Sequence, residues 1–273
     1  MKNLFIILFL AILSFGNTIE QIKDKNEIRI GINKSYPPFS TYEDGRFGGF
    51  EVEFAKEIAQ RIFGNDISIV FSPLNVKEQI PMLMENKLDL VVATLSVTNE
   101  RKKLIDFSMP YFSEQLAIVA KKSEKIKRLS DFRYKRLLFV PGTAAEEYIN
   151  SNPNEFSDIQ TIECEDMQEC FMKLKSGAAD GYFHSSLSVA IVPIIDPQYK
   201  IAVNTVGSPN FIAVGLSKGN TKLLRAVDKA ILSLSKEGFF KKAYDQTFNI
   251  YYKGTLDRKY FLLDDIYNVF TIN

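Results

Sequence analysis

The stretch that decides the fold runs from Ala93 to Tyr111 and reads ATLSVTNERKKLIDFSMPY. It follows an apolar run over residues 88–92, which is typical of a buried strand. Hydroxyl groups crowd the segment after that run, and Arg101 lies just inside a short helix that Thr98 can cap. A strand end, free backbone N–H groups, hydroxyls and one guanidinium together predict a socket for a small carboxylate.

Composition limits the partners that this socket can serve. The chain has 273 residues, enough for one large domain or two modest ones, with 46% hydrophobic and 25% charged residues, as in soluble globular proteins. A formal net charge of +1 gives no reason to expect nucleic acid or an anionic membrane as a partner. After the N-terminus no stretch reaches the roughly 18 apolar residues of a membrane span, so we expect a soluble exported protein.

Residues 1–16 predict a secretory signal peptide. Lys2 precedes an unbroken apolar run from Leu4 to Leu13, and small residues at Ser14 and Gly16 suit a signal peptidase. The apolar run is too short to cross a bilayer, and no cysteine lies nearby to carry a lipid anchor. We therefore expect a periplasmic or otherwise secreted protein after cleavage near Gly16.

The chain contains two cysteines, Cys164 and Cys170. Outside the cytosol two thiols usually pair, and this spacing allows a small loop between a strand end and the next helix; two reduced thiols remain the alternative. A metal site is not expected, because the one histidine, His184, is not near the pair in sequence. No cofactor is expected either.

Strands and helices alternate through the first half of the chain. Residues 27–32 read as a strand, Tyr36 lies in a proline-rich loop after it, and residues 50–63 show helical spacing of apolar side chains. Such alternation predicts an α/β fold whose sheets are wrapped by helices and bind ligands at the carboxyl ends of strands. The Tyr36 loop and the segment 94–101 both fall at such ends.

A second α/β series begins near Arg136 and contains a weak internal repeat of the first. Residues 83–90 align with residues 174–181 as helix end, turn, aspartate and buried strand, and Thr94 then matches Ser185. Each half would present a hydroxyl at the same strand end, although helix-turn-strand units also resemble one another by chance.

The last residues of the chain, 251–273, are expected to form a C-terminal extension. They are too apolar for a solvated tail, so we expect them to pack against the body of the protein; the alternative is a docking segment for a partner. The residues behind this expectation are Tyr251, Tyr252, Tyr260, Phe261, Ile266, Tyr267 and Phe270.

Several motifs in this order resemble those of the family 3 solute-binding proteins of polar amino-acid ABC importers. The motifs are SYPPF at 35–39, GFEV at 49–52, IPML at 80–83, SVTNERK at 96–102, DFSMPY at 106–111, VPGT at 140–143 and the EG pair at 237–238. The resemblance covers roughly residues 25–248.

The resemblance implies a two-lobe periplasmic-binding-protein type II fold, or Venus flytrap, in which each lobe is a mainly parallel sheet wrapped by helices. The first lobe would be discontinuous, with residues 24–112 plus 212–250. The second would span residues 117–207, and two crossing strands would hinge near residues 113–116 and 208–211.

The resemblance also implies roles for single residues. Arg101 matches the arginine that holds the ligand's α-carboxylate, and Ser96 matches a hydroxyl that meets the same group. Thr94 matches a contact to the ligand's ammonium group. In the second lobe the backbone N–H groups of the turn Thr143-Ala144 would reach the carboxylate on closure. Tyr36 matches an aromatic side chain that covers the ligand.

The chain departs from the family pattern at positions that matter for ligand choice. Val76 stands where many members have a second aromatic wall, and Asn33 where many binders of cationic ligands have an acid. Ser185 occupies the position of the acid that usually neutralises the ligand's ammonium group. A buried ammonium without a counter-charge is costly, so either another acid such as Glu51 or Glu146 supplies the charge, or the ligand is not an ordinary amino acid. A carboxylate without an ammonium group, or a modified amine, then becomes possible, and a strongly cationic ligand is disfavoured.

His184 stands beside Ser185 at the expected mouth of the lobe. It either contacts the ligand, or responds to pH, or is a histidine that is hydrogen-bonded to the backbone.

The leading hypothesis is a monomeric binding protein, not an enzyme, that captures a small carboxylate-bearing solute by hinge closure and delivers it to an ABC permease in the inner membrane. A sensory ligand-binding adapter is the alternative. An enzyme similar to cyclohexadienyl dehydratase is disfavoured, because Ser185 removes the expected acid and no catalytic residues are evident.

Overall fold

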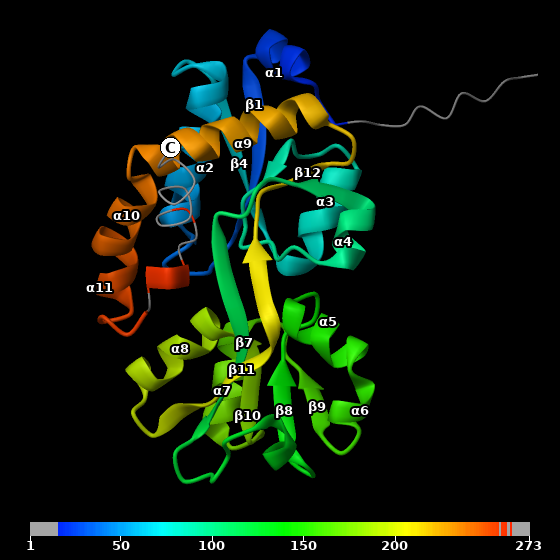
Figure 1. Cartoon of the computed structure of the whole chain (residues 1–273), viewed down its shortest axis with the longest axis vertical. Coiled ribbons are helices and arrows are strands. Elements are labelled where there is room, and N and C mark those ends of the chain that lie inside the picture. The colour runs from blue at the N-terminus through cyan, green and yellow to red at the C-terminus, as the bar shows by residue number, and fades with distance from the viewer. Residues whose placement is uncertain (1–15, 257, 261–262, 264–273) are drawn as a thin grey trace, which may run out of the picture.

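The computed structural model describes residues 16–256, 258–260 and 263, and it forms two lobes, each built on a five-stranded sheet (Figure 1). The predicted two-lobe α/β fold is therefore confirmed. The predicted signal peptide, residues 1–16, lies outside the described residues except for Gly16. None of the described helices is long and apolar enough to cross a membrane.

The first lobe carries the sheet β4-β1-β5-β12-β6. Its strands are β1 (Glu27–Asn33), β4 (Ser68–Leu74), β5 (Leu90–Val91), β6 (Ile105–Phe107) and β12 (Gly215–Ser217). A small hairpin, β2 (Thr41–Glu43) with β3 (Arg46–Gly48), lies beside it. Its helices are α1 (Ile19–Lys25), α2 (Phe50–Phe63), α3 (Gln79–Met84), α4 (Asn99–Leu104), α9 (Thr221–Lys236), α10 (Phe239–Ala243) and α11 (Asn249–Tyr251).

The second lobe carries the sheet β11-β7-β10-β8-β9. Its strands are β7 (Phe112–Lys121), β8 (Arg136–Phe139), β9 (Gln160–Glu163), β10 (Gly181–Ser185) and β11 (Tyr199–Ile212). Its helices are α5 (Ala144–Ser151), α6 (Pro153–Phe156), α7 (Met167–Ser176) and α8 (Ser186–Ile195), which cover both faces of the sheet.

Both sheets are mixed but mainly parallel, as expected, because four of the five strands in each sheet run in the same direction. In the first lobe β1 pairs in parallel with β4 and β5, whereas β12 is antiparallel to β5 and β6. In the second lobe β8 pairs in parallel with β9 and β10, whereas β7 is antiparallel to β10 and β11. The reversed strand is β12 in the first sheet and β7 in the second. β12 returns to the first sheet more than 100 residues after its neighbour β6 and runs against it.

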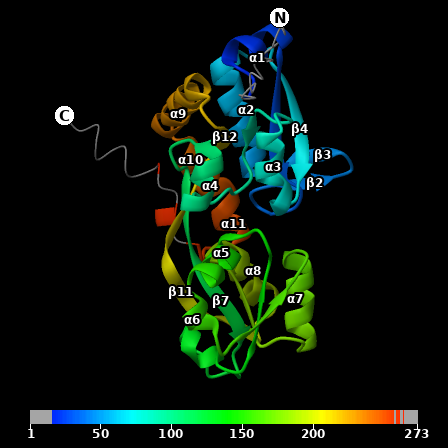
Figure 2. The same cartoon turned by 90° about the vertical axis from the view of Figure 1, so that its right-hand side faces the viewer.

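Two long strands, β7 and β11, run between the lobes and pair with each other in the antiparallel sense (Figures 1 and 2). At the crossing, Asn210 faces Glu114 and Ile212 faces Phe112. Register shifts interrupt the pairing between Val203 and Asn210, so the ladder is irregular just inside the second lobe.

The internal repeat has a physical counterpart in two matching ion pairs. Asp89 accepts hydrogen bonds from the backbone N–H of Arg29 at 2.8 Å and from its guanidinium at 2.8 and 3.1 Å. Asp180 does the same for Arg136, at 2.8 Å to the backbone and 2.9 and 3.1 Å to the guanidinium. Each aspartate thus fixes the turn before a strand to the start of the neighbouring parallel strand.

The core of the first lobe is a cluster of aromatic rings. Phe39, Phe54, Phe240 and Phe248 are all fully buried, and the ring of Phe50 lies between 5.3 and 6.3 Å from the rings of these four. These rings join the proline-rich loop, α2 and the helices after Gly238. The loop that presents Tyr36 therefore rests on a rigid base.

The described part of the C-terminal extension packs against the body, as expected. Tyr252, Leu256 and Leu263 are 2%, 7% and 3% exposed and belong to the core of the first lobe. The Tyr252 hydroxyl also donates to the carbonyl of Leu187 in the second lobe at 3.3 Å. The expectations for Phe261, Ile266, Tyr267 and Phe270 fall outside the described residues.

Cys164 and Cys170 form a disulfide, as expected for an exported chain, and it ties the end of β9 to α7. The bond closes a loop of six residues in sequence separation, for which chain entropy predicts about 2 kcal/mol of stabilisation. Urea denaturation with and without dithiothreitol should show this difference in the free energy of unfolding. Equal midpoints in the two conditions would show that the bond adds no stability.

Candidate ligand-binding site between the lobes

The functional candidates gather where the carboxyl ends of strands from the two lobes meet. Tyr36, in the loop after β1, is 7% exposed and its hydroxyl is hydrogen-bonded to Ser185 at 2.9 Å and to Ser188 at 2.7 Å. Ser185 ends β10 and caps α8 by accepting from the Ser188 backbone N–H. The first lobe therefore touches the second through a buried cluster of three hydroxyls.

Arg101 lies in the same seam and is 7% exposed. Thr98 caps its helix, as predicted, by accepting from the Arg101 backbone N–H at 3.2 Å. The guanidinium donates from Nη1 to the carbonyl of Ser96 and from Nη2 to the carbonyl of Gly142, both at 2.9 Å, and its Nε lies 2.9 Å from Glu147. The first contact is within the first lobe and the others reach the second, so the guanidinium bridges the lobes.

Burial lowers the pKa of Arg101, while the charges of Glu147 and Glu114 oppose that shift. A guanidinium remains protonated under any physiological condition, so the seam contains a fixed positive charge. The N–H groups of a guanidinium form a planar fork that suits a carboxylate. In this structure the carboxylate beside Nε is that of Glu147.

Thr94 occupies a strained turn at the end of β5, with a φ of +44°. Its backbone N–H donates to the Glu51 carboxylate at 2.6 Å, and its hydroxyl accepts from the Asn33 side chain at 2.7 Å. Gln79 donates in turn to Asn33 at 2.8 Å and to the carbonyl of Ala93 at 3.0 Å. Hydrogen bonds at both the nitrogen and the oxygen of its amide therefore fix the orientation of the Asn33 side chain. Gln79, which makes one of these bonds, was not identified from the sequence.

The two acids suggested as counter-charges are both engaged. Glu51 is fully buried and accepts from the backbone of Thr94 and from the hydroxyl of Tyr111, while its other oxygen has no hydrogen-bond partner. Burial raises the pKa of Glu51 to about 7. Glu146 accepts from the backbone N–H of Gly142 at 2.7 Å and so holds the turn before α5.

A third acid, Glu114, was not identified from the sequence. It lies on β7 at the crossing between the lobes and is 5% exposed. Burial and the charge of Glu51 raise its pKa to about 7, while the Ser185 hydroxyl and the charge of Arg101 oppose that rise. The signal in the sequence was a charged residue at a period-two position between the apolar Phe112 and Leu116.

The remaining candidates are placed around the guanidinium. Ser96 is 5% exposed and forms an isolated bridge with Ile212. Thr143 donates from its hydroxyl to the carbonyl of Val140 at 2.7 Å and precedes α5, which begins at Ala144; Thr143 and Ala144 are both 8% exposed. Val76 lies across from Gly142, because a Cβ on that glycine would come within 3.2 Å of it.

His184 is not brought into this cluster. Its Nδ1 accepts from the backbone N–H of Ser185 at 2.8 Å, and its ring lies 5.7 Å from that of Tyr182 on the face of β10 opposite to Ser185. Burial lowers the pKa of His184 to about 4, so the ring is neutral at physiological pH. The structure therefore places this histidine in the hydrogen-bonded role, which was one of the expected alternatives.

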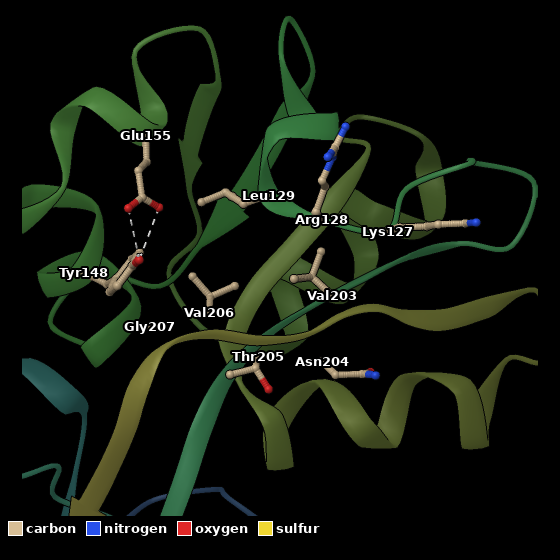
Figure 3. Close-up of a pocket in the computed structure, with 10 residues that line it drawn as sticks. All are labelled: Lys127, Arg128, Leu129, Tyr148, Glu155, Val203, Asn204, Thr205, Val206 and Gly207. Carbon is tan, nitrogen blue, oxygen red and sulfur yellow. Dashed lines mark hydrogen bonds between the residues drawn. The ribbon is translucent and has the colours of Figure 1, made fainter.

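One hollow borders the cluster and another lies away from it. An apolar cavity of about 170 Å³ lies behind Tyr36 and Ser188 and reaches the buried Tyr182, whose hydroxyl has no hydrogen-bond partner. A groove of about 440 Å³ lies on the second lobe between Lys127, Tyr148 and Gly207 (Figure 3). In this groove Tyr148 donates to Glu155, and none of the predicted site residues lines it.

Two lobes joined by crossing strands, with a buried guanidinium between them, define the class of two-lobe solute-binding proteins. Residues 28–250 match the family model of bacterial extracellular solute-binding proteins, family 3, and the chain belongs to that family.

The similar proteins include both curated sequences and solved structures. ABC transporter arginine-binding protein 1 of Escherichia coli (strain K12) is 27% identical over 253 residues, which cover 91% of this chain and 99% of that protein. The L-cystine-binding protein TcyJ of the same organism is 28% identical over 233 residues, covering 84% and 85%. A solute receptor for L-cysteine of Neisseria gonorrhoeae superposes with a TM-score of 0.82 at 28% identity, covering 89% of this chain and 98% of that one.

Proposed function

We propose that this protein binds a small amino acid between its lobes and delivers it to an ABC permease in the inner membrane. The observation that carries the proposal is the buried guanidinium of Arg101, which spans the two lobes. Relatives named for arginine, cystine and cysteine binding support the class of ligand. Their binding-protein names also support a role without catalysis.

In this proposal the ligand's carboxylate takes the place that the Glu147 carboxylate holds beside Arg101. Glu147 is free to leave, because its side chain is 31% exposed and can be solvated by water. The backbone N–H groups at Thr143 and Ala144, at the start of α5, would complete the carboxylate site, as would the Ser96 hydroxyl. Tyr36 would form the wall that covers the ligand.

Binding is proposed to couple to closure of the lobes about the crossing strands, with lobes at residues 24–112 plus 212–250 and 117–207. The contacts that would be made and broken are the hydrogen bonds of Tyr36 to Ser185 and Ser188, and that of Arg101 to Gly142. Hinges near residues 113–116 and 208–211 would absorb the movement, close to the irregular pairing in β11.

The proposal includes export, with cleavage near Gly16, and action as a periplasmic monomer. A sensory adapter that reports its ligand state to a receptor remains the second candidate. The partly exposed C-terminal face around Tyr251, together with Ile250, which is 69% exposed, is the surface to mutate in a test of partner choice.

A thermal-shift screen of the twenty amino acids, dicarboxylates and small amines tests the ligand class. An amino acid at 100 times its dissociation constant should add about 2.7 kcal/mol to the free energy of unfolding. We expect such a shift with at least one α-amino acid and none with amines that lack a carboxylate. Stabilisation by amines alone, or by no member of the panel, would contradict the proposal.

A further inference from the structure

We propose that Glu114 supplies the counter-charge for the ammonium group of the bound amino acid, in place of the acid that is missing at Ser185. The inference rests on the proposed function and deepens it. It assigns a binding residue on the crossing strand β7 and specifies the ligand class as an α-amino acid with a free ammonium group.

Strand geometry places Glu114 beside Ser185. In the antiparallel pairing of β10 with β7, Ser185 lies opposite Leu116, and paired residues point to the same face of the sheet. Glu114 is two residues before Leu116, so it shares that face and lies just beyond the end of β10. The carboxyl group therefore occupies the space that a longer, acidic side chain at Ser185 would reach.

The neighbours of Glu114 are the residues of the candidate site. Burial and, after it, the charge of Glu114 raise the pKa of Tyr36. The charge of Glu114 also opposes the lowering of the pKa of Arg101 by burial, and the Ser185 hydroxyl lowers the pKa of Glu114. An α-amino acid separates its carboxylate from its ammonium group by one carbon atom. A single ligand with its carboxylate on Arg101 would therefore have its ammonium group within reach of an acid next to that guanidinium.

Other acids near the seam are less suited to this task. Glu51 keeps one oxygen without a hydrogen-bond partner, but its other oxygen is held by the Thr94 backbone and the Tyr111 hydroxyl. Unlike the pKa of Glu114, the pKa of Glu51 is not affected by Ser185 or Arg101. Glu146 holds the backbone of Gly142. Glu147 lies against Arg101, where the ligand's carboxylate would bind.

The strand opposite Glu114 provides a second observation that points to a ligand. Asn210 is the register partner of Glu114, and the nitrogen of its side-chain amide is buried without a hydrogen-bond partner. A buried amide donor without a partner is costly, and a carboxylate oxygen of the ligand would satisfy it. The Glu114 carboxylate and the free Asn210 amide thus offer one partner for the ammonium group and one for the carboxylate of an amino acid.

The experiment is isothermal titration of wild type, Glu114→Gln and Glu114→Asp with L-cysteine, L-glutamine and L-arginine. Each amino acid is paired with the same acid without the α-ammonium group: 3-mercaptopropionic acid, glutaramic acid and 5-guanidinopentanoic acid. Glu163→Gln is the matched control, because Glu163 is an exposed glutamate on β9, at the far edge of the second sheet.

At pH 8 we expect Glu114→Gln to reduce the affinity for the amino acid that wild type binds by about 100-fold, because one partner of a buried charge pair is lost. Affinity for the matching deaminated acid should change less than about threefold, which also shows that the variant is folded. Glu114→Asp keeps the charge and should recover part of the affinity. Glu163→Gln should bind as wild type does.

The pH profile separates a counter-charge from a merely structural role. Wild-type affinity for the amino acid should rise as pH increases toward about 8, because the Glu114 carboxyl must lose its proton to pair with the ammonium group. In Glu114→Gln this rise in affinity due to Glu114 should be absent. The other groups that face Glu114 are Glu51, Arg101, Tyr36, Tyr111 and Tyr252, and they are the same in both proteins. The difference between the two pH profiles therefore reports the Glu114 carboxyl together with its coupling to Glu51.

Two outcomes would overturn the inference, and they are distinguishable. If wild type binds one of the amino acids and Glu114→Gln binds it as tightly, with the same pH profile, the inference alone fails. If wild type binds none of the three amino acids, and no other amino acid of the thermal-shift panel stabilises it, the proposed function fails and the inference fails with it.

Discussion

Replacing Arg101 with alanine is expected to reduce ligand affinity by 100-fold or more, which corresponds to about 3–5 kcal/mol. The guanidinium bridges the lobes through its bonds to Ser96 and Gly142, and Arg101 is 7% exposed. Its removal would leave the ligand's carboxylate buried without a counter-charge. It would also remove the hydrogen bond to Gly142 that helps to close the lobes.

Two further variants make this prediction specific. Arg101→Lys keeps the charge but lacks the planar fork, so it should bind more weakly than wild type and more tightly than Arg101→Ala. Arg133→Ala is the matched control, because Arg133 lies on the second lobe with a side chain that is 69% exposed. Binding would be measured by titration and folding by circular dichroism. A folded Arg101→Ala protein with wild-type affinity would exclude Arg101 from the site.

Local patterns predicted the elements that depend on local forces. The apolar spacing of residues 50–63 predicted the bounds of α2, and Thr98 caps the helix of Arg101 as expected. The repeat that aligned Asp89 with Asp180 reflects two equivalent ion pairs, because a turn aspartate at that position satisfies a neighbouring strand in each lobe. Arg101 was predicted as a site residue from its motif, and the structure places it in α4, between the lobes.

The features that were missed depend on contacts between distant segments. The identity of the one reversed strand in each sheet, β12 or β7, follows from where the chain returns, and β12 is a strand of only three residues. The role proposed for Glu114 depends on its register against Ser185, which is 71 residues away in the chain. Glu51 and Glu146 were nearer in sequence to the motifs, but backbone groups already engage them.

The second large effect is expected in the pH dependence of stability. Burial raises the pKa of Glu51 from 4.5 to about 7. Between these values the folded protein binds more protons than the unfolded chain, so the contribution of Glu51 to stability falls as pH rises and is fully lost above about 7. The shift corresponds to about 3 kcal/mol. The opposite sign applies to His184, whose pKa is lowered to about 4, so wild type alone would show both effects.

Glu51→Gln isolates the effect of Glu51, because it keeps a carbonyl oxygen for the Thr94 backbone and the Tyr111 hydroxyl while removing the charge. The difference in the free energy of unfolding between this variant and wild type should therefore grow in favour of the variant from pH 4.5 to pH 8, by about 3 kcal/mol. Since the charge of Glu51 also raises the pKa of Glu114, part of the gain comes through that neighbour. Urea denaturation of the ligand-free proteins at several pH values measures the difference, and His184 contributes equally to both. A difference that stays constant with pH would mean that the Glu51 carboxyl ionises in the folded protein as it does in the unfolded chain.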